Sequence, residues 1–304
     1  MRIYTHPACL AHDTGPGHAE HPERLIAVTE ALQKAYPASL DWQEAPRASR
    51  DQLLRAHTAP LLQSVLETAP TQRIMLDPDT VLSPDSAEAA LRAAGAAVAA
   101  VDAVLDGEVP RAFCAVRPPG HHATTDTAMG FCLFNSIAVA ALHALDGHGL
   151  ARVAVIDFDV HHGNGTQAIF ERDPRVLYLS SHQMPLYPDT GFADERGVGN
   201  IFNAPLPPGA ASEPFRAVWQ TQLLPALDAF RPQLLLVSAG FDAHRRDPLA
   251  QLQLEADDFA WLTRELAAIA DRHAQGRIVS MLEGGYDLQA LRECSVAHVG
   301  ALMT

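Results

Sequence analysis

Short apolar runs alternate with longer segments of helical periodicity along most of the chain. Five runs are rich in branched apolar residues and predict strands buried on both faces, as in a parallel sheet covered by helices. These runs cover residues 112–116, 153–156, 176–179, 234–237 and 278–282, and helical patterns cover 86–105, 135–145, 215–230 and 256–273. The alternation predicts one α/β domain over residues 1–304, with right-handed crossovers between its strands.

Two long segments, 7–22 and 183–208, interrupt this alternation with glycine, proline and histidine. We expect both to be irregular loops, because long loops without regular structure are commonly functional or disordered in a compact domain. The sequence leaves open whether segment 7–22 shapes the mouth of a site or mediates a contact between subunits.

Four of the predicted strands run directly into a group of polar residues. The groups are RPPGHH (117–122), DFDVHHGNG (157–165), SAGFDAH (238–244) and EGGY (283–286). The carboxyl ends of parallel strands open onto one crevice, which is where ligands bind in such sheets. We therefore expect these four groups to converge, although they lie far apart in the sequence.

The second group carries the pattern of a divalent-metal site. Asp157, Asp159 and His161 are spaced by two, so in an extended segment their side chains project to one side. The alternative is a solvated strand end, but the strand is predicted to be buried, and a metal removes the cost of burying two carboxylates. Asp242, at another strand end, is the natural further ligand. A site of two aspartates and one histidine leaves a coordination position open, as in catalytic zinc sites.

Tandem histidines and a tyrosine are candidates for proton transfer and carbonyl binding near this metal site. His121 and His122 follow a Pro-Pro-Gly turn that can aim both rings at the crevice, where neighbouring acids orient them. Tyr286 follows two glycines near the same mouth. Alone, the histidine pair would be equally well a surface feature and Tyr286 a packing residue. Histidines expected on the surface or in the core, without metal-type partners, are His143, His148, His273 and His298.

Composition and charge exclude several classes of protein. Hydrophobic residues make up 48% of the chain, which provides a core and excludes a disordered protein. The net charge of −14, without a Lys/Arg-rich run, argues against nucleic acid as a partner. The longest apolar stretch, 93–101, is too short to span a membrane. Four widely spaced cysteines and no signal-peptide pattern predict a cytoplasmic protein with reduced thiols, and a homo-oligomer stays open.

Six segments resemble motifs of the histone deacetylase family, most closely its class II-like bacterial members, with acetylpolyamine amidohydrolases as near relatives. They are HPERL (21–25), RPPGHHA (117–123), GFCLFN (130–135), VIDFDVHHGNGTQ (155–167), SAGFDAHRRDPL (238–249) and LEGGYDL (282–288). They occur in the family's order across nearly the whole chain, which makes the resemblance very specific. It implies a single arginase/deacetylase-like α/β domain with a central, mostly parallel eight-stranded sheet flanked by helices.

The resemblance also implies roles for individual residues. One zinc ion per chain would bind Asp159, His161 and Asp242. The catalytic residues would be His121, His122, Tyr286, Asp157 and Asn164. Of these, Asp157 would orient His121 and Asn164 would orient His122. Class I-like relatives carry aspartate in place of Asn164, so this residue places the chain with the class II-like group.

Further positions follow from the same resemblance. A structural monovalent cation, usually potassium, would lie near Asp157, Asp159, His161, Ser180 and Ser181, and a second one near Phe170, Asp173 and Val176. Substrate-binding positions would be Gly130, Phe131, Tyr187, Leu249 and Gly284, of which Phe131, Tyr187 and Leu249 match the walls of a narrow acyl-lysine tunnel. Arg24 matches a basic residue of an internal product channel.

The implied function is that of a zinc-dependent amidohydrolase. It would use a metal-activated water to remove acetyl or other acyl groups from the amine of lysine side chains or polyamine-like substrates. The acidic charge favours a cationic substrate. The physiological substrate, the acyl-chain preference and the native metal stay open.

Two alternatives remain at this point. Arginase-like ureohydrolases bind two manganese ions through a DxDxxDP segment, but this chain has His244 in place of the second aspartate, which argues for one metal. The other alternative is a pseudoenzyme that binds acylated ligands without turnover.

Overall fold

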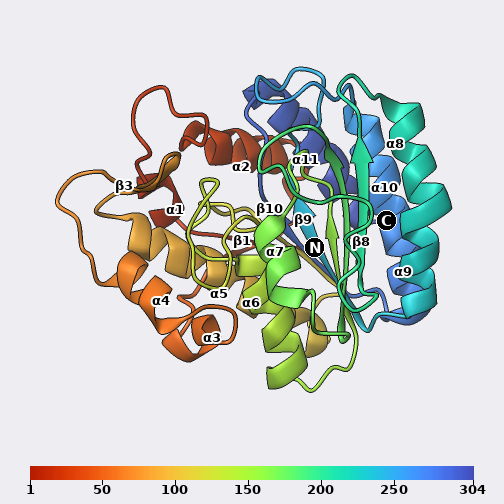
Figure 1. Cartoon of the computed structure of the whole chain (residues 1–304), viewed down its shortest axis with the longest axis horizontal. Coiled ribbons are helices and arrows are strands. Elements are labelled where there is room, and N and C mark those ends of the chain that lie inside the picture. The colour runs from red at the N-terminus through yellow and green to blue at the C-terminus, as the bar shows by residue number, and fades with distance from the viewer.

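The central sheet has eight strands, and every pair of neighbours in it is parallel, as the computed structural model of all 304 residues shows (Figure 1). Its order is β2-β1-β5-β10-β9-β6-β7-β8. The strands are β1 Arg2–Thr5, β2 Asp41–Glu44, β5 Arg111–Cys114, β6 Val153–Asp157, β7 Val176–Gln183, β8 Ile201–Leu206, β9 Leu234–Ala239 and β10 Ile278–Leu282. The α/β prediction and the eight-stranded sheet are thereby confirmed.

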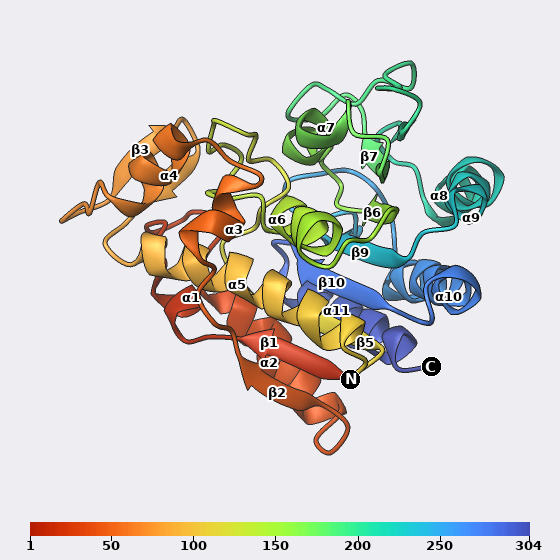
Figure 2. The same cartoon turned by 90° about the horizontal axis from the view of Figure 1, so that it is seen from below.

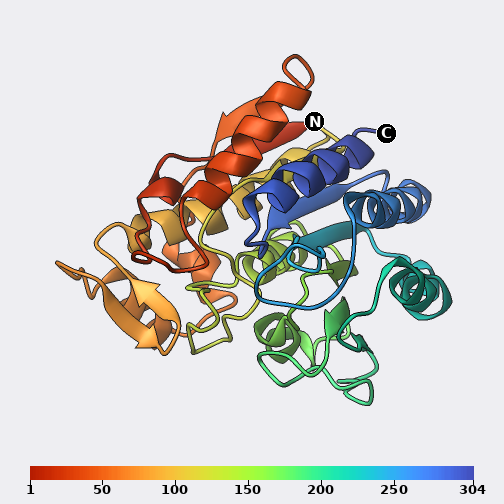
Figure 3. The same ribbon diagram turned by 90° about the horizontal axis from the view of Figure 1, so that it is seen from above.

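Helices form a layer on each face of this sheet (Figures 2 and 3). One layer contains α5 Ser86–Leu105, α6 Ser136–Leu142 and α7 Asn164–Phe170; the other contains α2 Glu23–Ala35, α8 Ser212–Val218, α9 Leu224–Phe230, α10 Ala256–His273 and α11 Leu288–Leu302. The shorter elements are α1 Ala8–Ala11, α3 Arg50–Leu54, α4 Ala59–Leu66 and the hairpin β3 Ile74–Asp77 and β4 Thr80–Leu82. Strands β5, β6, β9 and β10 are buried along their whole length, as expected for a sheet covered on both faces.

Small side chains let α5 pack closely against the sheet and its neighbours. The helix is rich in alanine, and a Cβ atom at Gly95 would lie 1.9 Å from the carbonyl oxygen of Pro46. Only glycine leaves room for the chain that follows β2 to cross the helix here. Helix α5 ends just before Gly107, whose φ of +77° is left-handed and favours glycine.

The prediction that 183–208 is an irregular loop is wrong for Ile201–Leu206, which forms β8. Pro205 and Asn203 gave this segment the composition of a loop. Strand β8 lies at the edge of the sheet, where a proline can be accommodated because one side of the strand needs no partner. Segment 7–22 likewise contains the short helix α1. Strands β1 and β2 were not predicted, because β1 has only four residues and β2 is polar and mostly exposed.

Two of the predicted helices contain a π turn. Helix α6 continues into a π turn at His143–Gly147, and the π turn Trp219–Leu223 joins α8 to α9. Pro225, at the start of α9, has no N–H group for the hydrogen bond that an uninterrupted α-helix would form there. No helix of the structure has the length and apolar character needed to cross a membrane.

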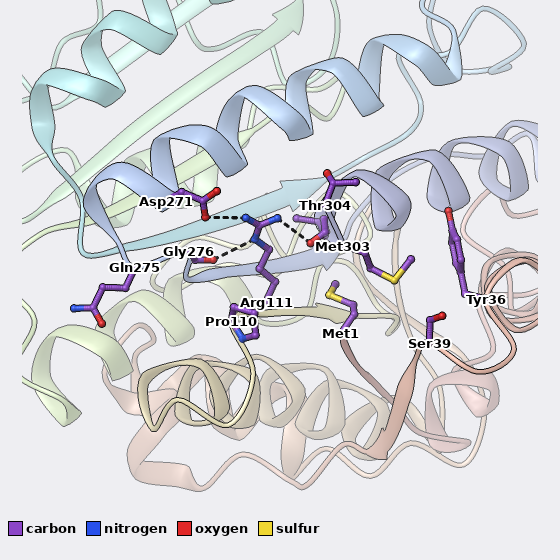
Figure 4. Close-up of a pocket in the computed structure, with 11 residues that line it drawn as sticks. Met1, Tyr36, Ser39, Pro110, Arg111, Asp271, Gln275, Gly276, Met303 and Thr304 are labelled. Carbon is purple, nitrogen blue, oxygen red and sulfur yellow. Dashed lines mark hydrogen bonds and ion pairs between the residues drawn. The ribbon is translucent and has the colours of Figure 1, made fainter.

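A hollow lies at the amino end of the strands (Figure 4). The arginine in it forms contacts that hold the fold together. Arg111, at the start of β5, lies within it and is 7% exposed. Its guanidinium donates hydrogen bonds to the carbonyl oxygens of Gly276 (3.3 Å) and Leu302 (3.0 Å) and to Oδ1 of Asp271 (2.9 Å). Arg111 therefore ties β5 to α10 and α11 at the end of the sheet away from the predicted site.

Candidate active site

The structure brings the four polar groups together at the carboxyl ends of β5, β6, β9 and β10. Asp157 ends β6, and the next residues of the loop carry Asp159 and His161. Asp242 follows β9, and its Oδ2 lies 3.2 Å from Nδ1 of His161. The Nδ1 atom of His121 lies 2.9 Å from Oδ2 of Asp157. The expectation drawn from parallel-strand geometry is met in the fold.

Asp159, His161 and Asp242 form a buried cluster whose potential ligand atoms all lie within 4.8 Å of one another. Nδ1 of His161 lies 3.0 Å from Oδ1 of Asp159. The backbone N–H of Gly284 donates to Oδ2 of Asp159 (2.8 Å), and that of Val160 donates to Oδ1 of Asp242 (2.8 Å). These bonds hold both carboxylates in place and leave their remaining lone pairs free for a cation.

The electrostatics of this cluster fit a bound divalent cation. Burial opposes the charged form of His161, yet its hydrogen bonds to Asp159 and Asp242 raise its pKa to about 10. Burial, and next the charge of Asp159, raise the pKa of Asp242 to about 6. The two carboxylates thus stabilise a positive charge inside the protein, whether His161 or a bound cation carries it. Two carboxylate oxygens and an imidazole nitrogen are a donor set that suits zinc with a position left open.

Two glycines make room for these carboxylates. A Cβ atom at Gly240 would lie 2.0 Å from Oδ2 of Asp159, and one at Gly284 would lie 2.0 Å from Oδ2 of Asp242. Gly284, predicted at a substrate-binding position, therefore lies against the cluster and not among the residues that line the cavity described below.

The tandem histidines have the partners that the resemblance implied. His121 contacts Asp157, and Nδ1 of His122 lies 2.8 Å from Oδ1 of Asn164. Because an amide oxygen only accepts, His122 carries its hydrogen on Nδ1 and presents Nε2 as an acceptor. Burial, and then the neighbouring rings of His121 and His161, lower the pKa of His122 well below its ordinary value. A neutral imidazole thus faces the cavity, which His122 helps to line.

His121 lies in the opposite electrostatic environment. Burial disfavours its charged form, but Asp157 and Asp159 outweigh this effect and raise its pKa well above the ordinary value. The two rings lie with their centroids 4.0 Å apart. The pair therefore combines a neutral and a charged imidazole side by side, which is a common arrangement for separate acid and base roles.

Glu283 supports the backbone of the tandem histidines, a role that the sequence did not reveal. Its Oε2 accepts hydrogen bonds from the backbone N–H of Gly120 (2.7 Å) and of His121 (3.2 Å). Its Oε1 accepts from the Ser238 hydroxyl (3.1 Å). Burial raises the pKa of Glu283 to about 7, against the opposing charge of His121. An acid directly after a buried, mostly apolar strand was the available signal for such a buried acceptor.

A cavity of about 250 Å³ lies beside the carboxylate–histidine cluster. It is lined by Asp79, His122, Gly130, Phe131, His161, Leu186, Tyr187, Leu249 and Tyr286. Four of the five predicted substrate-binding residues are among them. Asp79 was missed because it comes from the β3–β4 turn, which the apolar pattern did not predict. Its Oδ1 accepts a hydrogen bond from the backbone N–H of Gly130 (3.2 Å) and so fixes one wall of the cavity.

Tyr286 projects into this cavity with its backbone and its ring both held. The guanidinium of Arg24 lies 4.9 Å from the ring centroid and donates to the carbonyl oxygen of Gly285 (2.6 Å). Arg24 is fully buried and pairs with Glu20 (2.7 Å). These contacts assign Arg24 to the support of the Gly-Gly-Tyr turn; its place in a product channel stays a prediction.

Asp247 links the tyrosine to the opposite wall. Its Oδ2 accepts from the backbone N–H of Tyr286 (2.8 Å), and its Oδ1 accepts from that of Leu249 (2.9 Å). Asp247 belongs to the segment SAGFDAHRRDPL, but its role is evident only from these contacts. One carboxylate thereby sets the positions of two residues that line the cavity.

We predict that Asp247→Ala lowers kcat about 10²-fold, because a displacement of roughly 1 Å at Tyr286 is enough for such a loss. Asp247→Asn should lie between wild type and alanine, since its amide oxygen can accept only one of the two N–H groups. Metal content should stay at the wild-type level in both. The measurement is kcat beside zinc content, and a folded alanine variant with unchanged kcat would refute this positioning role.

The two monovalent-cation predictions fare differently. Asp157 and Ser180 are register partners on β6 and β7, so two of the five residues predicted for the first site lie side by side. For the second site, Asn200 Nδ2 lies 2.8, 3.0 and 2.9 Å from three carbonyl oxygens, and these belong to Phe170, Asp173 and Val176. An amide group has only two hydrogens for these three carbonyl oxygens, so the second ion site stays a prediction.

The remaining histidines correct one expectation. His298 is a satisfied core residue, placed between the hydroxyl groups of Thr263 (2.7 Å) and Ser280 (2.8 Å). The prediction that no metal-type partner is present is wrong for His273, which contacts Asp228 (3.0 Å), and for His143 and His148. The latter two contact Asp102, which lies far from them in the sequence and approaches only through the packing of α5 against α6.

Comparison with known families agrees with this geometry. The model of the histone deacetylase domain matches residues 18–302 of the chain. The chain belongs to the histone deacetylase family. The resemblance inferred from six motifs is confirmed, and with it the assignment to a family of hydrolases.

Individual relatives support a deacetylase function for this family member. The histone deacetylase-like amidohydrolase of Pseudomonas aeruginosa is 41% identical, over 97% of this chain and 83% of that protein. The polyamine deacetylase HDAC10 of Homo sapiens is 38% identical, over 93% of this chain and 44% of that protein. Among solved structures, the HD domain of HDA15 matches with a TM-score of 0.95 and 34% identity, over 99% of this chain and 87% of that one.

Proposed function

We propose that this member of the histone deacetylase family is a zinc-dependent amidohydrolase that removes acetyl groups from the amine of a linear, cationic substrate. The observation that carries the proposal is the buried group Asp159, His161 and Asp242 beside a narrow cavity lined by His122 and Tyr286. A zinc ion held by these three side chains would act as a Lewis acid toward the amide carbonyl and lower the pKa of the attacking water.

The other residues of the site then have separate tasks. Neutral His122 takes the proton of the attacking water at Nε2, while Asn164 holds the ring through Nδ1. The Tyr286 hydroxyl, for which the structure shows no hydrogen-bond partner, donates to the carbonyl oxygen as negative charge develops there. Charged His121 stabilises this negative charge at short range, and the histidine pair returns a proton to the leaving amine.

The shape and charge of the entrance favour a substrate with a slim chain and a positive charge. The cavity walls formed by Phe131, Tyr187 and Leu249 suit an aliphatic chain. Among the residues that line the cavity and the open hollow next to it, carboxylates are in excess over arginines: Asp13, Asp79 and Glu23 against Arg73. Such a mouth attracts a protonated amine or a lysine-containing peptide.

The arginase-like alternative is less consistent with the position of His244. Its Nδ1 accepts a hydrogen bond from the backbone N–H of Arg246 (3.2 Å), and its Nε2 faces Glu255 at 3.4 Å. The ring is therefore engaged elsewhere and does not join the cluster, which consists of Asp159, His161 and Asp242. This arrangement favours one metal ion in the site.

Two further proposals accompany this function. We propose a potassium ion near Asp157 and Ser180, supported by their adjacency at the ends of β6 and β7. We also propose a cytoplasmic protein with reduced thiols, supported by four cysteines that are all unpaired and buried.

The test compares kcat/KM for an acetyl-lysine peptide, acetylspermidine, acetylputrescine and L-arginine. We expect turnover of at least one acetylated amine and none of arginine, because the site offers one metal and a neutral base. Turnover of arginine alone would support the alternative that the protein is an arginase-like ureohydrolase. Tight binding of acetylated amines without turnover by the zinc-loaded protein would support the pseudoenzyme.

A further inference from the structure

A second cluster of ligating side chains lies at the other end of the molecule. Asp102 is in the last turn of α5, His143 is the first residue of the π turn that follows α6, and His148 comes directly after that turn. Helix α5 precedes β5, and α6 precedes β6, so the carboxyl ends of both helices lie at the amino edge of the sheet. The active-site cavity lies at the carboxyl edge. The cluster is therefore separate from the catalytic centre.

The two imidazole rings converge on a single carboxylate oxygen. Nε2 of His143 lies 2.6 Å from Oδ1 of Asp102, and Nε2 of His148 lies 2.7 Å from the same atom. The potential ligand atoms of the three residues all lie within 4.8 Å of one another. The side chains are 12%, 26% and 44% exposed for His143, His148 and Asp102, so solvent can reach the cluster.

The π turn is what brings the histidines onto one side. Its hydrogen bonds join residues five apart, and the backbone N–H of His148 donates to the carbonyl oxygen of His143 (3.3 Å). In a regular α-helix residues five apart point to different sides, because neighbours recur at three and four positions. Gly147 fits this turn, since a Cβ atom there would lie 3.1 Å from Nδ1 of His143. The two rings end up edge to face, with centroids 5.1 Å apart.

We propose that Asp102, His143 and His148 form a second, solvent-exposed site for a divalent transition-metal ion such as zinc or nickel. Two imidazole nitrogens and a carboxylate oxygen are donors that such ions prefer, and water would complete the coordination. Each Nε2 now donates its hydrogen to Asp102. The metal would take the place of these two protons, which is the usual exchange when histidines ligate.

Arg55 provides a specific signature of this site. Its Nη1 lies 2.8 Å from Nδ1 of His143, so Nδ1 accepts and the hydrogen of this neutral ring is on Nε2. A metal at Nε2 moves the hydrogen to Nδ1, where it faces the N–H of Arg55. The exposed arginine must then swing away. Removing Arg55 should therefore strengthen metal binding, whereas a purely structural network of hydrogen bonds would give no such effect.

The site has a consequence for counting metals. A chain that binds two ions would hold one in the Asp159 cluster and one at Asp102, without any binuclear active site. Stoichiometry alone would then be mistaken for evidence of an arginase-like centre. The proposal itself is independent of the proposed function, because it is read from metal binding and not from turnover.

The test is calorimetric titration of the metal-free protein with zinc, and separately with nickel. Wild type should bind two zinc equivalents, and His143→Ala or His148→Ala only one, with deacetylase turnover unchanged. His273→Ala is the matched control: this histidine also contacts a carboxylate, Asp228 (3.0 Å), but has no second histidine beside it. The control should keep two equivalents. Arg55→Ala should tighten the second site by up to about fivefold.

The opposite results are equally clear. A zinc stoichiometry that is the same in wild type, His143→Ala and His148→Ala, whether one equivalent or two, would overturn the proposal. Weaker binding of the second ion in Arg55→Ala would also contradict it. Loss of turnover in His143→Ala with the second ion still bound would show that the residue acts in another way.

Discussion

Tyr286→Phe should lower kcat roughly 10²–10³-fold, which is the usual cost of removing one donor to a developing oxyanion. The substitution deletes one hydroxyl and leaves the ring, so the contact with Arg24 and the backbone bond to Asp247 persist. Zinc content and melting temperature should stay near wild type, since the hydroxyl binds neither a ligand residue nor the core. The measurement is kcat, zinc content and Tm on one preparation.

The matched control for this variant is Tyr36→Phe. The Tyr36 hydroxyl donates to the carbonyl oxygen of Val296 (3.0 Å), far from the cavity. Its loss should leave kcat at the wild-type level. If the folded, zinc-loaded Tyr286→Phe protein also turned over at that level, Tyr286 would be a packing residue and the proposed carbonyl activation would be wrong.

Loss of any predicted zinc ligand should remove both metal and activity. Asp159→Ala, His161→Ala and Asp242→Ala each delete one of three donors, and the remaining buried carboxylate or carboxylates then lack compensation. We expect kcat to fall more than about 10²-fold, beyond the range seen for residues that only orient a ligand. Inductively coupled plasma mass spectrometry on the His143→Ala background would count the metal of the active site alone.

Asp157→Ala is the discriminating comparison within the same motif. Asp157 contacts His121 (2.9 Å) and the Tyr178 hydroxyl (3.1 Å), not the cluster of potential ligand atoms. This variant should lose catalysis and some stability but keep part of its zinc. A zinc-free Asp157→Ala protein beside a fully loaded Asp242→Ala protein would reverse the ligand assignment.

The sequence predicted the buried strands well because burial on both faces leaves a predominantly apolar run. The strands β6, β9 and β10 fall where such runs occur, and their carboxyl ends carry the site. The strands at the edges of the sheet could not be predicted from an apolar run. Strand β2 has the sequence DWQE, and its pairing with β1 is decided by backbone hydrogen bonds that leave no apolar pattern.

The residues that support the site were harder to predict than those that form it. Asp159, His161 and Asp242 could be singled out as candidate metal ligands because they place charge at the ends of predicted buried strands. Asp247 and Glu283 act on backbone N–H groups, and such contacts depend on loop conformation, which composition does not encode. For the same reason Asp102 could not be linked to His143 from sequence: the link requires both the packing of α5 on α6 and a π turn.

The most direct test of the central claim is a zinc titration of turnover. Metal-free protein carrying His143→Ala, which retains only the active-site cluster, would be titrated with zinc while hydrolysis of an acetyl-lysine peptide is followed. The account predicts no turnover without metal and a linear rise that saturates at one zinc per chain. Full turnover in the metal-free protein, or saturation only at two metal ions per chain, would contradict it.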